Sequence, residues 1–170
     1  IDQDSLDIIN IEFKGSANGY NCNYDLKLLD LEQDHLSIPE LDYATIIMLP
    51  STEFKKICQD LMVTGGDSMV ITVKKNEKMA RFTSVGDFGT CNIELEPRDL
   101  NDPDGPIMIN AGDDINMSFS LKYLCMFTKA TVLSEHVSVY FSDRMPVLVE
   151  YKTGSSYVRY YLAPKIEDDE

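Results

Sequence analysis

Residues 51–61, with the sequence STEFKKICQDL, are the first of two segments that interrupt the alternation of apolar and polar positions along most of the chain. The apolar positions of this segment recur at i, i+3, i+4 and i+7, the spacing of one face of an α-helix, and they are Phe54, Ile57, Cys58 and Leu61. Pro50 and Ser51 are favourable starting residues, and we expect Ser51 to be the N-cap. A helix with one apolar face among strands must pack that face on a sheet.

The rest of the chain reads mainly as β-strand, because apolar and polar residues alternate in a period of two. Turn-forming stretches rich in Gly, Pro, Asn and Asp separate the runs. The expected strands cover residues 6–13, 24–31, 43–49, 69–73, 80–84, 91–95, 107–110, 115–118, 137–141, 147–151 and 157–162. The predicted class is therefore α+β, dominated by antiparallel sheet.

A second helical pattern, over residues 120–130, indicates an internal repeat. Its helical face consists of Leu121, Leu124, Cys125 and Thr128. When the two helices are superimposed, Phe54 lies on Tyr123 and Ile57 lies on Met126. Each unit then runs strand, helix and three strands. We expect the two units to form one continuous sheet with both helices on one face.

The repeat also divides the chain. Residues 43–166 are expected to form a complete domain of two similar halves, whereas residues 1–27 hold too few strands for a core of their own and are expected to be the C-terminal remnant of a preceding domain. Residues 28–42 form an extended connector, and residues 167–170 form an acidic tail. Because the chain begins with Ile1, we expect a fragment, a processed product or an incomplete chain.

Composition narrows the classes of function. The formal charge of −14, from 15 basic and 29 acidic residues, opposes a bulk coat of nucleic acid, although a local basic face remains compatible with it. The four cysteines include no Cys-x-x-Cys pair, so we expect buried free thiols in a reducing compartment and no zinc site. No apolar run is long enough to span a bilayer and no signal-peptide pattern opens the chain, so we expect no membrane contact.

The sequence contains no recognisable catalytic constellation. His35 lies in the acidic connector and His136 in an expected strand, and neither neighbours a nucleophile turn. Phosphate-loop and dinucleotide fingerprints are missing, and the turn at residues 100–105 lacks the ligands of a calcium loop at its first and last positions. We therefore expect no enzyme, no cofactor and no metal.

The outward faces of the two expected helices are locally basic. Opposite the apolar positions lie four lysines, called here the basic stripe: Lys55, Lys56, Lys122 and Lys129. A solvated helix face is the ordinary interpretation of such a pattern. If both helices lie on the same face of the sheet, the charges instead add into a patch suited to weak, sequence-independent contact with phosphates.

Five stretches of the sequence carry a family resemblance, and they are LKLLDLEQDHLSIPE (26–40), PSTEFKKICQDL (50–61), FTKATVLS (127–134), MPVLVEYK (145–152) and YYLAPKIEDDE (160–170). They resemble the proliferating cell nuclear antigen family of eukaryotic DNA sliding clamps. The resemblance covers almost the whole chain and begins inside the family's first domain. It implies the DNA-clamp fold and a nuclear, non-enzymatic protein that forms a homotrimeric ring when full length, with sheets outside and helices lining a hole through which duplex DNA passes.

The resemblance assigns roles to particular residues. The basic stripe becomes the DNA-facing surface, and Gln59 stands where the family usually has a basic residue. DNA polymerase, clamp loader, ligase and flap nuclease would each insert a motif, Gln-x-x-aliphatic-x-x-aromatic-aromatic, into an apolar pocket. The matching pocket positions are Leu36, Ile38, Pro39, Pro146, Tyr161, Ala163, Pro164 and Ile166.

The resemblance also implies how subunits meet. A strand of the first domain pairs with a strand of the next subunit's second domain, and the matching ranges are 21–28 and 88–95. Unpaired strand edges of this kind favour strand addition. The interface residues expected there are Cys22, Tyr24, Leu26, Thr90, Cys91 and Ile93. Lys75 matches a lysine that ubiquitin-like proteins modify in the family.

Two alternatives stay open. The same fold also serves the subunits of a heterotrimeric checkpoint clamp, although the connector and YYLAPKIE favour the replicative family. A different class of function is a truncated clamp that binds partner peptides without encircling DNA.

Overall fold

The computed structural model describes residues 7–14, 19, 21–28 and 42–165. The chain divides into two compact units, Ile1–Glu40 and Leu41–Glu170, and each is described by itself. The predictions for Leu36, Ile38, Pro39 and Ile166, for most of the connector and for the acidic tail concern residues outside the described ranges.

The first unit contains an antiparallel hairpin of β1 (Ile8–Lys14) and β2 (Asn21–Lys27). Its register gives the hairpin one apolar and one mainly polar face, because alternate residues of a strand point to opposite sides. The cross-strand pairs on the apolar face are Ile9 with Leu26, Ile11 with Tyr24, and Phe13 with Cys22. Five of these six side chains are exposed, and Cys22 is half-buried. A two-stranded hairpin is marginally stable by itself, so this apolar face requires a cover.

The second unit follows the predicted repeat. Its first half consists of β3 (Thr45–Pro50), α1 (Ser51–Met62), β4 (Ser68–Val73), β5 (Ala80–Gly86) and β6 (Gly89–Leu95). A short strand, β7 (Met108–Ala111), follows. The second half consists of β8 (Ile115–Ser120), α2 (Leu121–Phe127), the 3-10 helix η2 (Thr128–Leu133), β9 (His136–Phe141), β10 (Val147–Thr153) and β11 (Ser156–Leu162). The order strand, helix and three strands is thus confirmed in both halves.

The expectation of one continuous sheet is wrong. The described strands of this unit form a five-stranded sheet, ordered β11-β10-β9-β3-β7, and a four-stranded sheet, ordered β6-β5-β4-β8. Each half therefore contributes its first strand to the sheet of the other half. Strand β3 runs directly into α1 at Ser51, whose N–H donates to the carbonyl of Glu135 at 2.8 Å. Strand β8 runs into α2 in the same way, and the N–H of Leu121 donates to the carbonyl of Asp67 at 2.9 Å.

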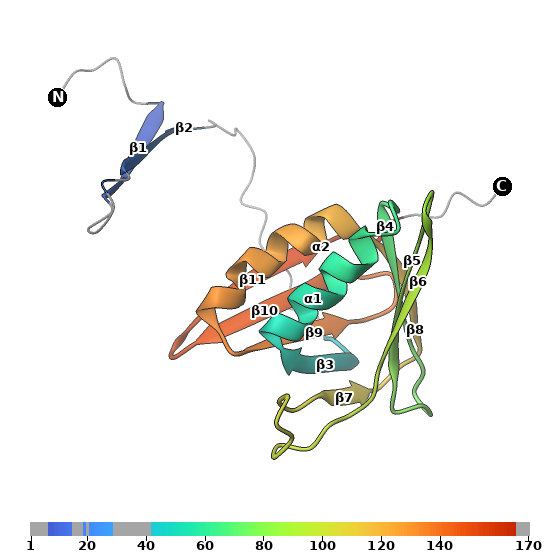
Figure 1. The fold of residues 1–170 in the computed structure, drawn as a ribbon. Coiled ribbons are helices and arrows are strands. Elements are labelled where there is room, and N and C mark those ends of the chain that lie inside the picture. The colour runs from blue at the N-terminus through green and yellow to red at the C-terminus, as the bar shows by residue number, and fades with distance from the viewer. Residues whose placement is uncertain (1–6, 15–18, 20, 29–41, 166–170) are drawn as a thin grey trace. The chain divides into compact units, whose positions relative to one another are not determined.

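The core lies between the helices and the two sheets. Figure 1 shows α1 and α2 side by side across one face of the sheet that contains β9, β10 and β11. The apolar positions of α1 point inward, and Phe54, Cys58 and Leu61 are at most 1% exposed. They pack with buried residues of both sheets, such as Val139 and Phe82. Burial of these side chains on a shared core stabilises both helices at once.

The helix ends differ from the sequence prediction. Ser51 is the first residue of α1 rather than its N-cap, because β3 extends to Pro50 and leaves no intervening turn. The second helix was predicted over residues 120–130 as one element, but its α-helical part ends at Phe127 and continues as η2. The Thr128 hydroxyl donates to the carbonyl of Cys125 at 2.7 Å, a side-chain bond that competes with regular helical bonding.

The four cysteines are free, as predicted. Cys58 is fully buried, whereas Cys22, Cys91 and Cys125 are half-buried, so the expectation of burial was right for one of the four. Cys22 and Cys91 lie on β2 and β6, which are edge strands of the described sheets, and this position explains their partial access to solvent. In the part of the chain that the structure describes, helices are too short and too polar to cross a membrane.

Candidate functional site

The basic stripe lies on the solvent side of the two helices. Lys55 and Lys56 on α1, Lys122 on α2 and Lys129 on η2 are all exposed. Among the described residues no carboxylate lies within ion-pair distance of these lysines, whereas Glu53 of α1 is paired with the half-buried Arg98. Since direct ion pairs to these ammonium groups are absent among the described residues, they attract phosphate, while the exposed Asp60 of α1 reduces the local positive charge.

The opposite side of the five-stranded sheet is aromatic. We call its central group the outer cluster, and it consists of Tyr43, Tyr140, Pro146, Leu148 and Tyr161. Leu148 of β10 faces Tyr140 of β9 and Tyr161 of β11 in the cross-strand register. Since alternate residues change sides, Val149 points to the helices and Leu148 points away from them. Leu148 is nevertheless only 6% exposed, because the tyrosines cover it.

Tyr43 joins this cluster to the strand that follows. Its hydroxyl donates to the carbonyl of Pro146 at 3.1 Å, and its ring lies 5.8 Å from that of Tyr140. Burial, with a smaller effect of the nearby Tyr161, raises the pKa of Tyr43. From the sequence alone, Tyr43 was predicted only to lie at the start of a strand. That position, two residues before β3 begins at Thr45, was the one indication that its side chain belongs to the sheet. The structure thus brings Pro146 and Tyr161 together around a residue that was missed.

A buried carboxylate supports the same face. The Glu150 side chain is 1% exposed and accepts from the Arg159 guanidinium at 2.6 Å and from the Tyr140 hydroxyl at 3.0 Å, with the Lys152 ammonium at 3.2 Å. Burial raises the pKa of Glu150, but the hydrogen bonds from Arg159, Lys152 and Tyr140 outweigh it, so the pKa lies below its ordinary value. The carboxylate therefore stays charged and ties β9, β10 and β11 together beneath the outer cluster.

The residues after β11 are fastened to the other sheet. The backbone N–H of Lys165 donates to the carbonyl of Ser118 at 2.7 Å, on the edge of β8. The Lys165 ammonium lies 2.9 Å from the carboxylate of Asp67 and 2.6 Å from the Ser68 hydroxyl. The hydrogen bond from Lys165 is the largest of the effects that lower the pKa of Asp67. These contacts fix the position of the exposed Ala163 and the half-buried Pro164.

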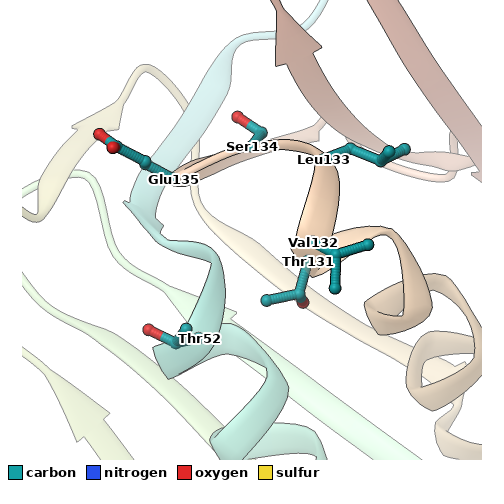
Figure 2. Close-up of a pocket in the computed structure, with 6 residues that line it drawn as sticks. All are labelled: Thr52, Thr131, Val132, Leu133, Ser134 and Glu135. Carbon is teal, nitrogen blue, oxygen red and sulfur yellow. The ribbon is translucent and has the colours of Figure 1, made fainter. Parts of the chain in front are cut away.

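A separate hollow of about 320 Å³ lies beside the start of α1. Figure 2 shows its lining, which is drawn from α1, η2 and the turn that follows η2. The lining residues are Thr52, Thr131, Val132, Leu133, Ser134 and Glu135. None of them was predicted for a site, and a hollow lined by three hydroxyl side chains, two aliphatic side chains and one carboxylate lacks the aromatic walls that a peptide anchor requires.

The residues expected at a subunit interface lie on β6 and β2, which are edge strands among the strands that the structure describes. Strand β6 is the outermost strand of the four-stranded sheet and carries the exposed Thr90 and the half-buried Cys91 and Ile93. In the first unit, Cys22, Tyr24 and Leu26 lie on the apolar face of the hairpin. Lys75 lies in the exposed turn between β4 and β5, where its backbone N–H donates to the Asp114 carboxylate at 2.7 Å.

Two strand-helix-three-strand units with exchanged first strands, and two adjacent helices on one face, define the DNA-clamp class of α+β folds. Residues 37–166 match the family described as proliferating cell nuclear antigen, C-terminal domain. The chain belongs to the proliferating cell nuclear antigen family.

Two relatives illustrate the similarity. The chain is 42% identical over 170 residues to the proliferating cell nuclear antigen of Chaetomium thermophilum, covering 99% of this chain and 64% of the relative. It is 40% identical over 161 residues to proliferating cell nuclear antigen 2 of Drosophila melanogaster, covering 94% of this chain and 60% of the relative. The chain therefore spans somewhat less than two thirds of the length of these relatives.

Proposed function

We propose that the protein acts as a DNA sliding clamp, a non-enzymatic processivity factor of the nucleus that needs no cofactor. The observation that carries the proposal is the basic stripe. In a chain of net charge −14, four exposed lysines gather on two adjacent helices without a carboxylate partner among the described residues. Contacts of this kind hold duplex DNA by its phosphates, independently of base sequence.

The proposed mechanism is topological. Three copies would close a ring, with β2 of one subunit adding to the edge of β6 in the next, and the helices would line the hole. A polymerase tethered to such a ring stays near its template, because tethering raises its effective concentration there. Weak phosphate contacts suit this role, since they let the ring move along the duplex.

The outer cluster is the proposed docking place for partners. Polymerase, clamp loader, ligase and flap nuclease would insert the aromatic residues of their motif among Tyr43, Pro146 and Tyr161, with Ala163 and Pro164 as a further wall. The family resemblance adds four further residues to the proposed pocket, namely Leu36, Ile38 and Pro39 of the connector, and Ile166. Aromatic anchors gain affinity in a site with apolar walls and exposed backbone groups of a nearby strand end.

The ring hypothesis is tested by the topology of the DNA. We expect native mass spectrometry to detect three copies of the chain, and clamp loader to place them on nicked circular duplex. Cutting the circle should then release the protein, whereas the uncut circle retains it. Equal retention on circular and cut DNA would contradict encirclement.

The small first unit favours a second candidate. Its described strands form a single two-stranded hairpin, which is too small for a core of its own, so this chain would act as a partner-peptide module that does not close a ring. A monomer that binds the motif peptide and is not retained on circular DNA would support this second function over the first.

A further inference from the structure

Two cysteines meet where α1 packs against α2. Cys58 of α1 is 0% exposed, and Cys125 of α2 is half-buried. The Cys125 thiol donates to the backbone carbonyl oxygen of Cys58 across 3.5 Å. The remaining cysteines lie elsewhere, Cys22 on β2 and Cys91 on β6.

The two thiols differ in reactivity. The hydrogen bond from Cys58 lowers the pKa of Cys125, against the opposing effect of burial. The same contact, together with burial, raises the pKa of Cys58 well above its ordinary value. An accessible thiol that ionises readily is the one that oxidants attack, whereas a buried thiol is protected. Cys125 is the more accessible of the two thiols and is therefore the one that a peroxide reaches first, and Cys58 lies beside it as the partner that would resolve the product.

We propose that Cys58 and Cys125 form an oxidative modification site, which closes to a disulfide between α1 and α2 when the protein meets hydrogen peroxide. The Cys125 sulfur lies 3.5 Å from the carbonyl oxygen of Cys58, so the two residues are neighbours across the α1–α2 contact. Rotation of both side chains would bring the sulfurs to the S–S bonding distance of about 2 Å. The inference does not depend on the proposed function.

The chemistry balances without a further reactant. The Cys125 thiolate attacks one oxygen of the peroxide, the O–O bond breaks, and the hydroxide that leaves takes up a proton to become water. Cys125 is then a sulfenic acid. The Cys58 sulfur attacks the Cys125 sulfur, the S–O bond breaks, and the hydroxyl leaves as water with the proton of Cys58. Two thiols lose two electrons, and one peroxide is reduced to two waters.

The disulfide would join residues 67 positions apart in the chain. A cross-link that closes a long loop restricts the unfolded chain, so the Tm should rise by roughly 5 °C or more. It would also fix the two helices that carry the basic stripe relative to each other.

The test uses the complete chain. The protein is treated with hydrogen peroxide, its remaining thiols are alkylated under denaturing conditions, and it is digested and mapped by mass spectrometry without reduction. We expect a joined pair of peptides that contain Cys58 and Cys125, which a reductant separates. The double variant Cys22→Ser/Cys91→Ser should form the same cross-link, and the Cys125→Ser variant should leave Cys58 alkylated and react with peroxide at least fivefold more slowly.

Three outcomes would overturn the inference. One is sulfenic acid that accumulates at Cys125 while Cys58 remains alkylated. Another is a cross-link that includes Cys22 or Cys91 in place of either residue. The third is an absence of oxidation at Cys125 at peroxide concentrations that oxidise a free cysteine.

Discussion

The two sides of the five-stranded sheet differ in what they present to solvent. On one side, α1 and α2 cover the strands (Figure 1), and the lysines of these helices are exposed. On the other side, tyrosines cover Leu148, and a buried carboxylate joins three strands. One sheet thus separates a surface suited to phosphates from a surface suited to aromatic side chains. The two surfaces of this one sheet therefore differ in charge and in side-chain type, although they share the same strands.

The largest loss of stability is expected from a substitution in the hydrophobic core that lies between the helices and both sheets. Phe54→Ala leaves a cavity between α1 and both sheets, because Phe54 is 1% exposed. We expect the free energy of unfolding to fall by about 3–5 kcal/mol, measured by urea denaturation. Binding of duplex and of motif peptide should weaken together. A loss confined to one ligand would show that the two sides do not share this core.

A change beneath the outer cluster should affect that side more than the helices. Glu150→Gln removes the charge that Arg159 and Lys152 approach, and we expect a loss of about 1–3 kcal/mol in the free energy of unfolding at neutral pH. Motif-peptide affinity should decrease while duplex affinity at matched folded concentration stays unchanged. Glu77→Gln, at an exposed ion pair, is the control and should change neither.

The same carboxylate predicts a pH dependence. The folded-state pKa of Glu150 lies below its ordinary value of 4.5, so its stabilisation is complete above that pH and is lost as the pH falls through the lower folded-state value. The difference in unfolding free energy between the natural chain and Glu150→Gln should therefore shrink below about pH 4.5. Urea titrations at pH 7 and at decreasing pH measure it. A difference that grows in acid would contradict the assigned sign.

A smaller effect is expected from one hydroxyl of the outer cluster. Tyr43→Phe removes the donor to the Pro146 carbonyl but keeps the ring against Tyr140. We expect motif-peptide affinity to fall about two- to tenfold, the effect of one hydrogen bond, by fluorescence anisotropy. Tyr157→Phe, an exposed tyrosine of β11, is the matched control. If both variants lose affinity equally, the cluster does not bind the peptide at Tyr43.

The smallest effect concerns the attachment of residues 163–165. Asp67→Asn removes the ion pair with Lys165, and exposed ion pairs contribute little, so a decrease in peptide affinity of about twofold is expected. The exchange Asp67→Lys with Lys165→Asp should restore the affinity. If Asp67→Asn lowers peptide affinity and the double exchange does not restore it, the loss of affinity does not arise from the ion pair between Asp67 and Lys165.

The buried and exposed sides of each helix and strand were predictable from the sequence, whereas the strands that pair with one another were not. The spacing of Phe54, Cys58 and Leu61 specifies the buried face of α1, and Lys55 and Lys56 then have to face solvent. The exchange of β3 and β8 between the two sheets was not predictable, because strand pairing depends on contacts between residues far apart in sequence. Strand alternation likewise gave no indication that Tyr43 meets Pro146, which is 103 positions away.

The separation of the two surfaces is tested most directly by a variant that lacks the basic stripe. Labelled duplex and motif peptide are titrated into the quadruple variant Lys55→Ala/Lys56→Ala/Lys122→Ala/Lys129→Ala, with Lys75→Ala/Lys78→Ala as a control at exposed lysines of the β4–β5 turn. We predict that duplex affinity falls at least about tenfold with a shallower salt dependence, and that peptide affinity is unchanged. Unchanged duplex affinity, or an equal loss in the control variant, would contradict the assignment of the helical side to DNA.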